Sequence, residues 1–178
     1  PLALICPSHG IIWRKRIPQI IERYQAWSDN YQTNQITILY DTMWNSTRIM
    51  AEQIAAGMKD AAPEVVIKLL NVAKSDKNDI LTEVFRSRIV LVGSPTVNNG
   101  YTYAMAGILE MIRGLKFKNK KAAAFGSYGW GGEAVKLLNA AMLEAGFEVL
   151  GDGLRCQWVP DTSAIEQARQ FGRFIAEN

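Results

Sequence analysis

The sequence predicts an α/β domain in which an open, five-stranded parallel sheet carries helices on both faces. Short apolar or β-branched segments alternate with amphipathic segments from residue 36 to the end of the chain. The segment Ile89–Val92 is apolar without a break, as in strands that are buried on both faces. The amphipathic segments supply the crossover helices that parallel strands need, so helices should cover both faces of the sheet.

The strands can be placed along the chain by their apolar runs and the breakers around them. They are expected at 36–40, 65–70, 89–92, 121–125 and 147–159. The last of these should be interrupted near Gly151 and Gly153, because glycine weakens a strand interior. Lysines at positions 116, 118, 120 and 121 flank the start of the fourth strand. We expect all four at a solvated edge of the sheet.

Apolar residues with helical spacing predict helices between the strands. Met50, Ile54 and Met58 recur every four positions behind the first strand, which gives that helix one apolar face. Further helices are expected at 76–86, 103–113, 133–145 and 163–175. Ser163 and Glu166 have the spacing of a capping box, so the last helix should begin at Ser163.

Residues 1–35 differ in character from the domain at 36–178. An apolar run is followed by a turn at Pro7–Gly10, a helix is expected at 17–27, and a polar linker reaches residue 35. His9, at the turn, is the single histidine of the chain. Without a second histidine or a cluster of cysteines or carboxylates nearby, it is expected to be a surface or capping residue rather than a metal ligand.

Composition narrows the class of protein. The chain has 178 residues, 48% of them hydrophobic and 21% charged, as in a globular domain. A net charge of +3 without a polybasic face argues against nucleic acid as a partner. No apolar run reaches the roughly 18 residues of a membrane helix, so no membrane partner is expected. The two cysteines are far apart, which fits a reducing cytoplasm.

The loop Asp41–Thr47, between the first strand and its helix, is rich in hydroxyl groups. N–H groups at the start of a helix, with the hydroxyls of Thr42, Ser46 and Thr47, favour a bound anion, most naturally a phosphate. The loop has no Gly-Lys-Ser/Thr run, so it is not a nucleoside-triphosphate loop, and without any glycine it is not a dinucleotide-binding loop. It also lacks the cysteine that a cysteine-dependent phosphatase would need there. The alternative is an ordinary turn whose Ser and Thr residues only cap the helix.

Two further loops follow the third and fourth strands, at the edge where such sheets bind ligands. They span residues 93–100 and 126–132 and combine hydrogen-bonding groups with aromatic side chains. Tyr128, Trp130 and, in the first loop, Trp44 could stack on a flat heterocycle. The alternative is that Tyr128 and Trp130 only anchor their loop to the core.

Three sequence runs carry a resemblance to a known family. They are Asp41-Thr42-Met43-Trp44-Asn45-Ser46-Thr47, Gly93-Ser94-Pro95-Thr96-Val97-Asn98-Asn99-Gly100 and Phe125-Gly126-Ser127-Tyr128-Gly129-Trp130-Gly131-Gly132. Residues 36–178 are similar throughout to the flavodoxin domain of flavodiiron proteins. The resemblance implies a flavodoxin-like sheet of order 2-1-3-4-5 and a bound FMN. Asn45 stands where glycine is usual, and asparagine tolerates the left-handed backbone that this turn needs.

The resemblance also assigns the cofactor contacts. It places the FMN phosphate on the first loop and the isoalloxazine ring between the other two. The residues so assigned are Thr42, Met43, Trp44, Asn45, Ser46, Thr47, Ser94, Pro95, Thr96, Val97, Asn98, Asn99, Ser127, Tyr128, Gly129, Trp130, Gly131 and Gly132. Asp41 is the only carboxylate in these loops, so a comparatively high flavin reduction potential is expected.

Residues 1–35 resemble the closing segment of the metallo-β-lactamase-like di-iron domain of the same family, followed by a linker. His9 would bind iron in an intact parent protein, but its other ligands and the cysteine pairs of a rubredoxin domain are not in this chain. In the parent, the resemblance implies that electrons pass from a rubredoxin centre to FMN and on to the di-iron site, which reduces nitric oxide to nitrous oxide. The parent would be a head-to-tail homo-oligomer, and this chain alone a monomeric electron carrier.

Two other protein classes share the predicted architecture. An NAD(P)H:quinone oxidoreductase would use the same fold as an enzyme, and its flavin would bleach rapidly with NAD(P)H alone, which we do not expect here. A response-regulator receiver domain needs an aspartate after the third strand and a lysine after the fifth. Ser94 and Trp158 stand at these places, so the receiver domain is disfavoured.

Overall fold

The computed structural model describes residues 2–29 and 31–178 and divides the chain into two compact units, Pro1–Tyr31 and Gln32–Asn178. In the first unit, Ile5 and Trp13 form an antiparallel bridge through N–H···O bonds of 3.1 and 3.0 Å. The bridge closes the turn that contains His9, and helix α1 (Ile17–Ser28) follows it. The helix expected at 17–27 is therefore present.

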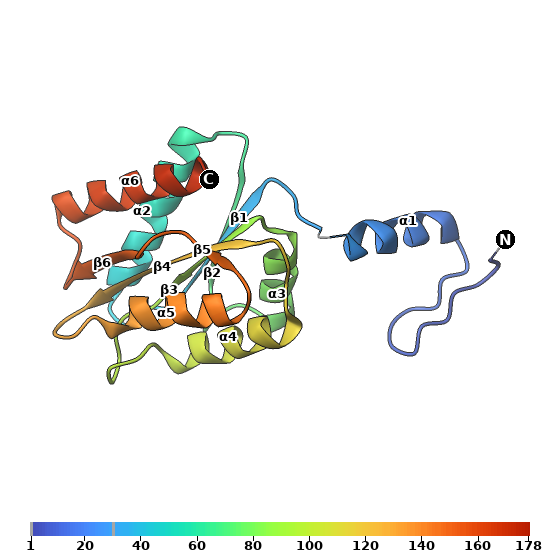
Figure 1. Cartoon of the computed structure of the whole chain (residues 1–178), viewed down its shortest axis with the longest axis horizontal. Helices are drawn as coiled ribbons and strands as arrows, with labels where there is room; N and C mark the ends of the chain where they lie inside the picture. Colours follow the sequence, from blue (N-terminus) through green and yellow to red (C-terminus); the bar gives the residue numbers. More distant parts are fainter. Residues whose placement is uncertain (1, 30) are drawn as a thin grey trace. The chain divides into compact units, whose positions relative to one another are not determined.

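The second unit is built on a parallel sheet in the order β2-β1-β3-β4-β5, with β6 also pairing with β4 (Figure 1). The bounds of the strands are β1 Gln35–Tyr40, β2 Val66–Asn71, β3 Ile89–Gly93, β4 Lys121–Tyr128, β5 Glu148–Val149 and β6 Leu154–Gln157. This order confirms the fold class predicted from the sequence. Because the order reverses between β1 and β3, a crevice is expected beyond their carboxyl ends.

The fifth strand position is divided, as its glycines predicted. β5 pairs with the start of β4 and β6 with its end, both in parallel. Between them, Gly151 and Gly153 take positive φ values of 69° and 86°, a backbone region that favours glycine. The break lets one continuous strand, β4, hold two short partners.

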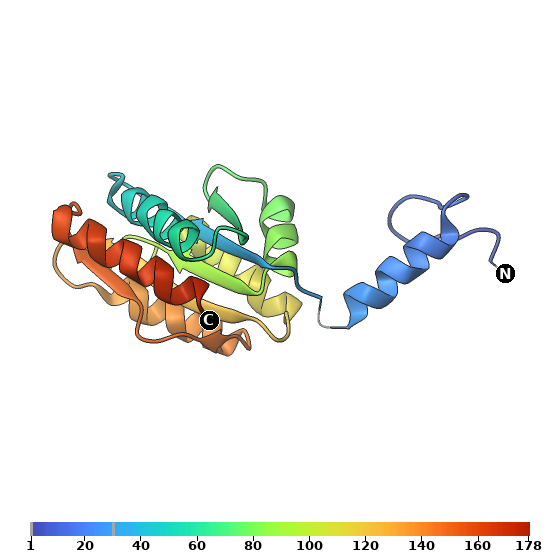
Figure 2. The ribbon, with the colours of Figure 1, turned by 90° about the horizontal axis from the view of Figure 1, so that it is seen from above.

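Among the described residues of the second unit, the helices that cover the sheet are α2 Ser46–Ala61, α3 Lys77–Arg86, α4 Tyr103–Leu115, α5 Glu133–Glu144 and α6 Thr162–Ala176. Helices α2 and α6 lie on one face, and α3, α4 and α5 lie on the other (Figure 2). Residues of β1 alternate between the two cores, with Ile36 and Ile38 on the α2 side and Leu39 on the α4 side. The sheet is therefore buried on both faces.

Helices α2 and α6 approach so closely that their backbones touch through glycine. A Cβ atom added to Gly57 would overlap the backbone carbonyl of Arg169, and one added to Gly172 would overlap that of Ile54. Each helix therefore offers a glycine to the other's backbone. This crossing fixes the position of α2, whose first residue lies at the candidate site.

The start of the last helix differs from the expected capping box. α6 begins at Thr162, and its cap is Asp161, whose carboxylate accepts the N–H of Ala164 at 2.8 Å. Glu166 instead pairs with Arg173 at 3.2 Å, one exposed pair on the helix surface. The expectation that Ser163 starts the helix was wrong because an earlier side chain, Asp161, already satisfies the N–H group in the first turn.

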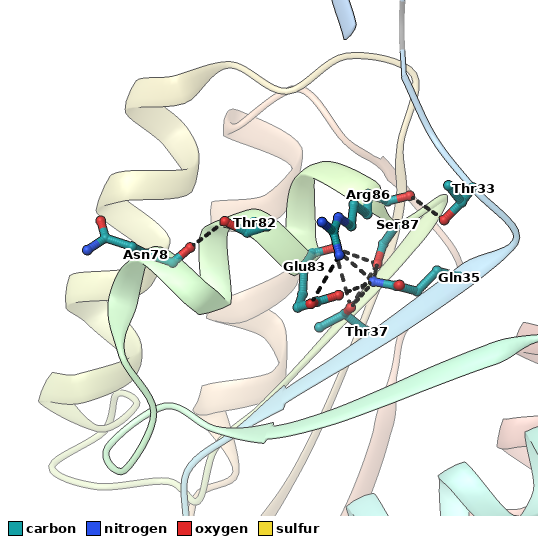
Figure 3. Close-up of polar contacts among 8 residues, drawn as sticks. All are labelled: Thr33, Gln35, Thr37, Asn78, Thr82, Glu83, Arg86 and Ser87. Atoms are coloured by element: carbon teal, nitrogen blue, oxygen red, sulfur yellow. Dashed lines mark hydrogen bonds and ion pairs between the residues drawn. The ribbon is translucent and has the colours of Figure 1, made fainter. Parts of the chain in front are cut away.

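A buried polar cluster fixes α3 to the amino end of β1 (Figure 3). The hydroxyls of Thr37 and Ser87 lie 2.7 Å apart. The side-chain amide of Gln35 donates to Glu83 Oε2 at 2.8 Å and to Ser87 Oγ at 3.1 Å. Since buried polar groups are costly unless paired, this network fixes the position of the end of α3 against β1.

Lys120 corrects the expectation that four lysines form a solvated edge. Lys116 and Lys118 are exposed, but Lys120 is 3% exposed, and its Nζ donates to the backbone oxygens of Phe85 and Ser87 at 2.8 and 2.7 Å. These carbonyls lie at the carboxyl end of α3, where a cation is favoured. Burial lowers the pKa of Lys120 to about 8. The prediction of a solvated Lys120 was wrong because it was based on the charge of the side chain alone.

Replacing Lys120 by methionine is expected to change how stability depends on pH. Below about pH 8 the lysine is protonated in both the folded and the unfolded chain, and the cost of burying its charge is fully present. Between about pH 8 and 10.5 the unfolded chain binds the extra proton, so the free energy of unfolding gains about 1–3 kcal/mol as pH rises. Urea unfolding at several pH values, with the exposed Lys118→Met as control, measures this gain. A gain that persists in Lys120→Met would contradict the assignment.

Candidate functional site

A pocket of about 550 Å³ lies where the loops after β1, β3 and β4 meet. Its volume is in the range of small-molecule and cofactor sites. The residues that line it are Met43, Trp44, Ser46, Pro95, Thr96, Val97, Asn98, Asn99, Ser127, Tyr128, Gly129, Trp130, Gly131, Glu133 and Trp158. The structure thus brings together residues of all three loops singled out from the sequence.

The first loop ends in a helix start without a side-chain cap. Asn45 is left-handed, with φ 67°, and no side chain caps the first turn of α2 among the described residues. The expected left-handed asparagine is confirmed. The alternative, in which Ser and Thr cap the helix, is not supported, because no such bond is present and the Thr47 hydroxyl bonds Ser127 instead. The hydroxyl of Thr42 is shielded from solvent and has no partner among the described residues. An uncapped helix start beside a hydroxyl is a combination found in phosphate-binding sites of proteins.

The second loop is shaped by its own hydrogen bonds. Ser94 is fully buried, and its Oγ accepts the N–H of Thr102 at 3.0 Å and donates to the Pro95 carbonyl at 2.9 Å. Val97 and Gly100 bond to each other through both backbone groups, and the two asparagines between them have positive φ. This is the pattern of a two-residue hairpin turn, for which asparagine is suited.

Hydrogen bonds tie the three loops to one another. The hydroxyls of Thr47 and Ser127 lie 2.9 Å apart and join the first loop to the third. The Thr96 N–H donates to the Ser127 carbonyl at 2.9 Å, and Thr96 Oγ1 accepts the N–H of Ala134 at 3.3 Å. Ser127 and Thr96 are therefore the points at which loops from β1, β3 and β4 are joined.

Exposed aromatic side chains stand at the mouth of the pocket. Trp44 is 84% exposed and Trp130 is 89% exposed, although both line the pocket. Exposed tryptophans at a pocket offer flat apolar surface for a ligand ring. This position does not support the alternative that Trp130 merely anchors its loop to the core.

Trp158, which follows β6, is a pocket residue that the sequence reasoning did not select. Its ring packs edge-to-face on Trp130 with 5.2 Å between centroids, and its backbone N–H donates to the backbone carbonyl of Tyr128 at 2.8 Å. A Cβ atom on Gly129 would lie 2.9 Å from the Trp158 ring, so glycine makes room for it. The signal available was its place after the fifth strand, at the same edge of the sheet as the three loops.

Glu133, the first residue of α5, is a second residue that the sequence reasoning missed. It lines the pocket, and its Oε2 is shielded from solvent without a hydrogen-bond partner among the described residues. It stands one position beyond the third loop, and for that reason a count of loop carboxylates left it out.

Some residues assigned from the sequence do not line the pocket. They are Thr42, Asn45, Thr47, Ser94 and Gly132. Thr47 and Ser94 are fully buried and hold the loops together, while Asn45 and Gly132 give the left-handed turns before α2 and α5. Apart from Thr42, whose hydroxyl has no partner among the described residues, these residues shape the site from behind its surface.

His9 lies in the first unit, in the turn closed by the bridge between Ile5 and Trp13. Its Nδ1 is 3.1 Å from the Ser8 hydroxyl, and both residues are exposed. Within residues 2–29 and 31–178, no group of three or more His, Cys, Asp or Glu side chains is placed to hold a metal ion. In the same part of the chain, no helix has the length and apolar character to cross a membrane.

Comparisons with known proteins place the chain in a family. A family model described as Flavodoxin matches residues 38–172. The chain is 52% identical over 177 residues to an anaerobic nitric oxide reductase flavorubredoxin of Vibrio vulnificus, covering 99% of this chain and 36% of the relative. A flavorubredoxin of Klebsiella pneumoniae is 51% identical with the same coverage. The chain therefore spans about a third of the length of these relatives.

Solved structures show the same likeness. Rubredoxin oxygen:oxidoreductase of Desulfovibrio gigas superposes with a TM-score of 0.91 at 34% identity, over 98% of this chain and 43% of that one. The flavodiiron protein of Giardia intestinalis gives a TM-score of 0.91 at 27% identity, over 99% and 44%. With the family match across most of the second unit, these findings show that the chain belongs to the flavodoxin family.

Proposed function

We propose that the chain binds FMN in the pocket described above and carries electrons through it. The observation that carries this proposal is the convergence of three loops on one cavity that combines an uncapped helix start with exposed tryptophans. FMN supplies one- and two-electron chemistry when bound, and the protein orients it and tunes its potential. No nucleophile or general base is needed for that task.

The described residues fit the two parts of the cofactor. The N–H groups at the start of α2 and the unpartnered Thr42 hydroxyl suit the phosphate. Trp44 and Trp130 offer flat apolar surface to the ring, and the hairpin at Asn98 and Asn99 offers backbone and amide groups to its polar edge. The eighteen residues assigned from the sequence are thus proposed as contacts or as supports of contacts.

In a longer parent protein, this chain is proposed to relay electrons from a rubredoxin centre to a di-iron site that reduces nitric oxide to nitrous oxide. The names of the relatives and the third of their length that the chain spans support this role. On the same reasoning, residues 1–35 are the end of a di-iron domain plus a linker, and His9 is one of its iron ligands. The parent is proposed to be a cytoplasmic homo-oligomer.

Titration with FMN tests the central proposal. We expect the purified chain to bind FMN with a micromolar or tighter dissociation constant, seen as quenched flavin fluorescence. At a hundredfold excess over that constant, binding should stabilise the fold by about 2.7 kcal/mol. Riboflavin, which lacks the phosphate, should bind at least about tenfold more weakly because the start of α2 is then left without an anion. A folded chain that stays free of FMN at micromolar concentrations would refute the proposal.

The same sample separates an electron carrier from an NAD(P)H:quinone oxidoreductase. The relatives do not favour the enzyme alternative. NADH or NADPH added without a partner protein should leave the flavin absorbance unchanged on the timescale of turnover. Rapid bleaching would instead support a nicotinamide site and the enzyme alternative.

A further inference from the structure

One carboxylate stands in the wall of the pocket, and its position depends on a neighbouring glycine. A Cβ atom added to Gly131 would overlap both carboxylate oxygens of Glu133. The Glu133 side chain is therefore folded back over the bare Cα of Gly131, within the third loop. There its Oε2 is shielded from solvent and has no hydrogen-bond partner among the described residues.

Glu133 is also distinctive by charge. Among the described residues that line the pocket, it is the only one with a carboxylate or a cationic side chain. Asp41, the carboxylate of the first loop, accepts the N–H of Thr42 at 2.8 Å and does not line the pocket. A charge held in a shielded pocket wall acts more strongly than one in open solvent, because water screens it less.

We propose that the Glu133 carboxylate lowers the reduction potential of the flavin in this pocket, and that it can occupy its position because Gly131 has no side chain. This inference rests on the proposed function. Reduction of the FMN ring by two electrons, with uptake of one proton, leaves one negative charge on a ring that was neutral. A fixed carboxylate beside the ring repels that charge, so the pocket binds oxidised flavin more tightly relative to reduced flavin. Glu133 acts through space as a tuning residue and exchanges no electron or proton itself.

The expectation of a comparatively high potential, made by counting loop carboxylates, is therefore revised downward. Glu133→Gln keeps the size of the side chain and removes its charge. This substitution should raise the dissociation constant of oxidised FMN divided by that of reduced FMN, called the ratio below, by about three- to tenfold. A tenfold change corresponds to about 30 mV for a two-electron couple. Dye-coupled redox titration of the FMN-loaded chain, against free FMN, gives this ratio directly.

Gly131→Ala supplies an independent variant with the charge retained. Because the added methyl group meets only the far end of a flexible side chain, the carboxylate should move away from its place at modest cost in stability. The ratio should rise as in Glu133→Gln, by a smaller factor. In the double variant it should equal that of Glu133→Gln alone, since there is no charge left to displace.

Glu144→Gln is the matched control, since it makes the same charge change at the other end of α5, about 16 Å along the helix. It should leave the ratio unchanged. The inference is overturned if Glu133→Gln leaves the ratio within about twofold of the wild type. It is also overturned if Gly131→Ala shifts the ratio equally with and without the Glu133 charge. A wild-type chain that binds no FMN overturns the proposed function and this inference together, whereas normal binding with an unchanged ratio overturns the inference alone.

Discussion

Gly57→Ala is expected to lower the free energy of unfolding by about 3 kcal/mol or more, the largest effect on stability that we predict. The added Cβ atom would overlap the backbone carbonyl of Arg169 in α6. A backbone atom cannot turn aside as a side chain can, so the two helices would have to move apart. Their shared core, which includes Met50 and Ile54, would then lose contacts. Urea unfolding followed by circular dichroism measures the loss.

Gly107→Ala in α4 is the matched control, because nothing lies within 4 Å of the added Cβ atom. There alanine should stabilise the fold by about 0.5–1 kcal/mol, because it favours the helix more than glycine does. Equal effects of the two substitutions would mean that helix propensity alone decides them. The close crossing of α2 and α6 would then make no contribution to the free energy of unfolding.

Gly126→Ala is expected to weaken FMN binding by about ten- to a hundredfold, the largest effect on the site that we predict. Gly126 lies in β4, and a Cβ atom there would overlap the backbone carbonyl of Ser94. Ser94 closes the second loop through its bond to the Thr102 N–H. Displacing it should move the hairpin at Asn98 and Asn99 away from the pocket. Fluorescence titration with FMN measures the change.

Gly100→Ala tests whether any added methyl group near the second loop has this effect. Its Cβ atom would lie 3.7 Å from the Val97 carbonyl, an ordinary contact, so binding should stay within about twofold of the wild type. Circular dichroism and the urea midpoint of Gly126→Ala show whether the variant is folded when its affinity is measured. A folded Gly126→Ala that binds FMN as tightly as the wild type would contradict the proposed role of the Ser94 contact.

The sequence was informative wherever a pattern is set by neighbours along the chain. Periodicity gave the strands and helices within a few residues, as α3 shows by starting at Lys77 after Asp76. Backbone conformations that depend on one residue type were also predicted correctly, since Asn45 is left-handed and the glycines at 151 and 153 break the last strand. The three loops could be grouped because the carboxyl ends of parallel strands lie at one edge.

Features set by contacts distant in sequence could not be read in this way. Lys120 resembles its exposed neighbours by charge, and only the position of α3 buries it. Trp158 reaches the pocket because β6 pairs with the end of β4, a pairing between segments that are distant in the sequence. Glu133 was missed because the pocket wall continues from the loop into the helix, beyond the end of the sequence run.

The hydrogen bonds that join Thr47, Thr96 and Ser127 are made between protein groups alone. The loss of conformational entropy on ordering the loops therefore accompanies folding of the chain, and little of it is left to oppose capture of a ligand. For a redox cofactor, a binding site that is already ordered also affects the rate of electron transfer. Loops held together in this way are expected to rearrange little when charge arrives, which keeps the reorganisation energy of electron transfer small.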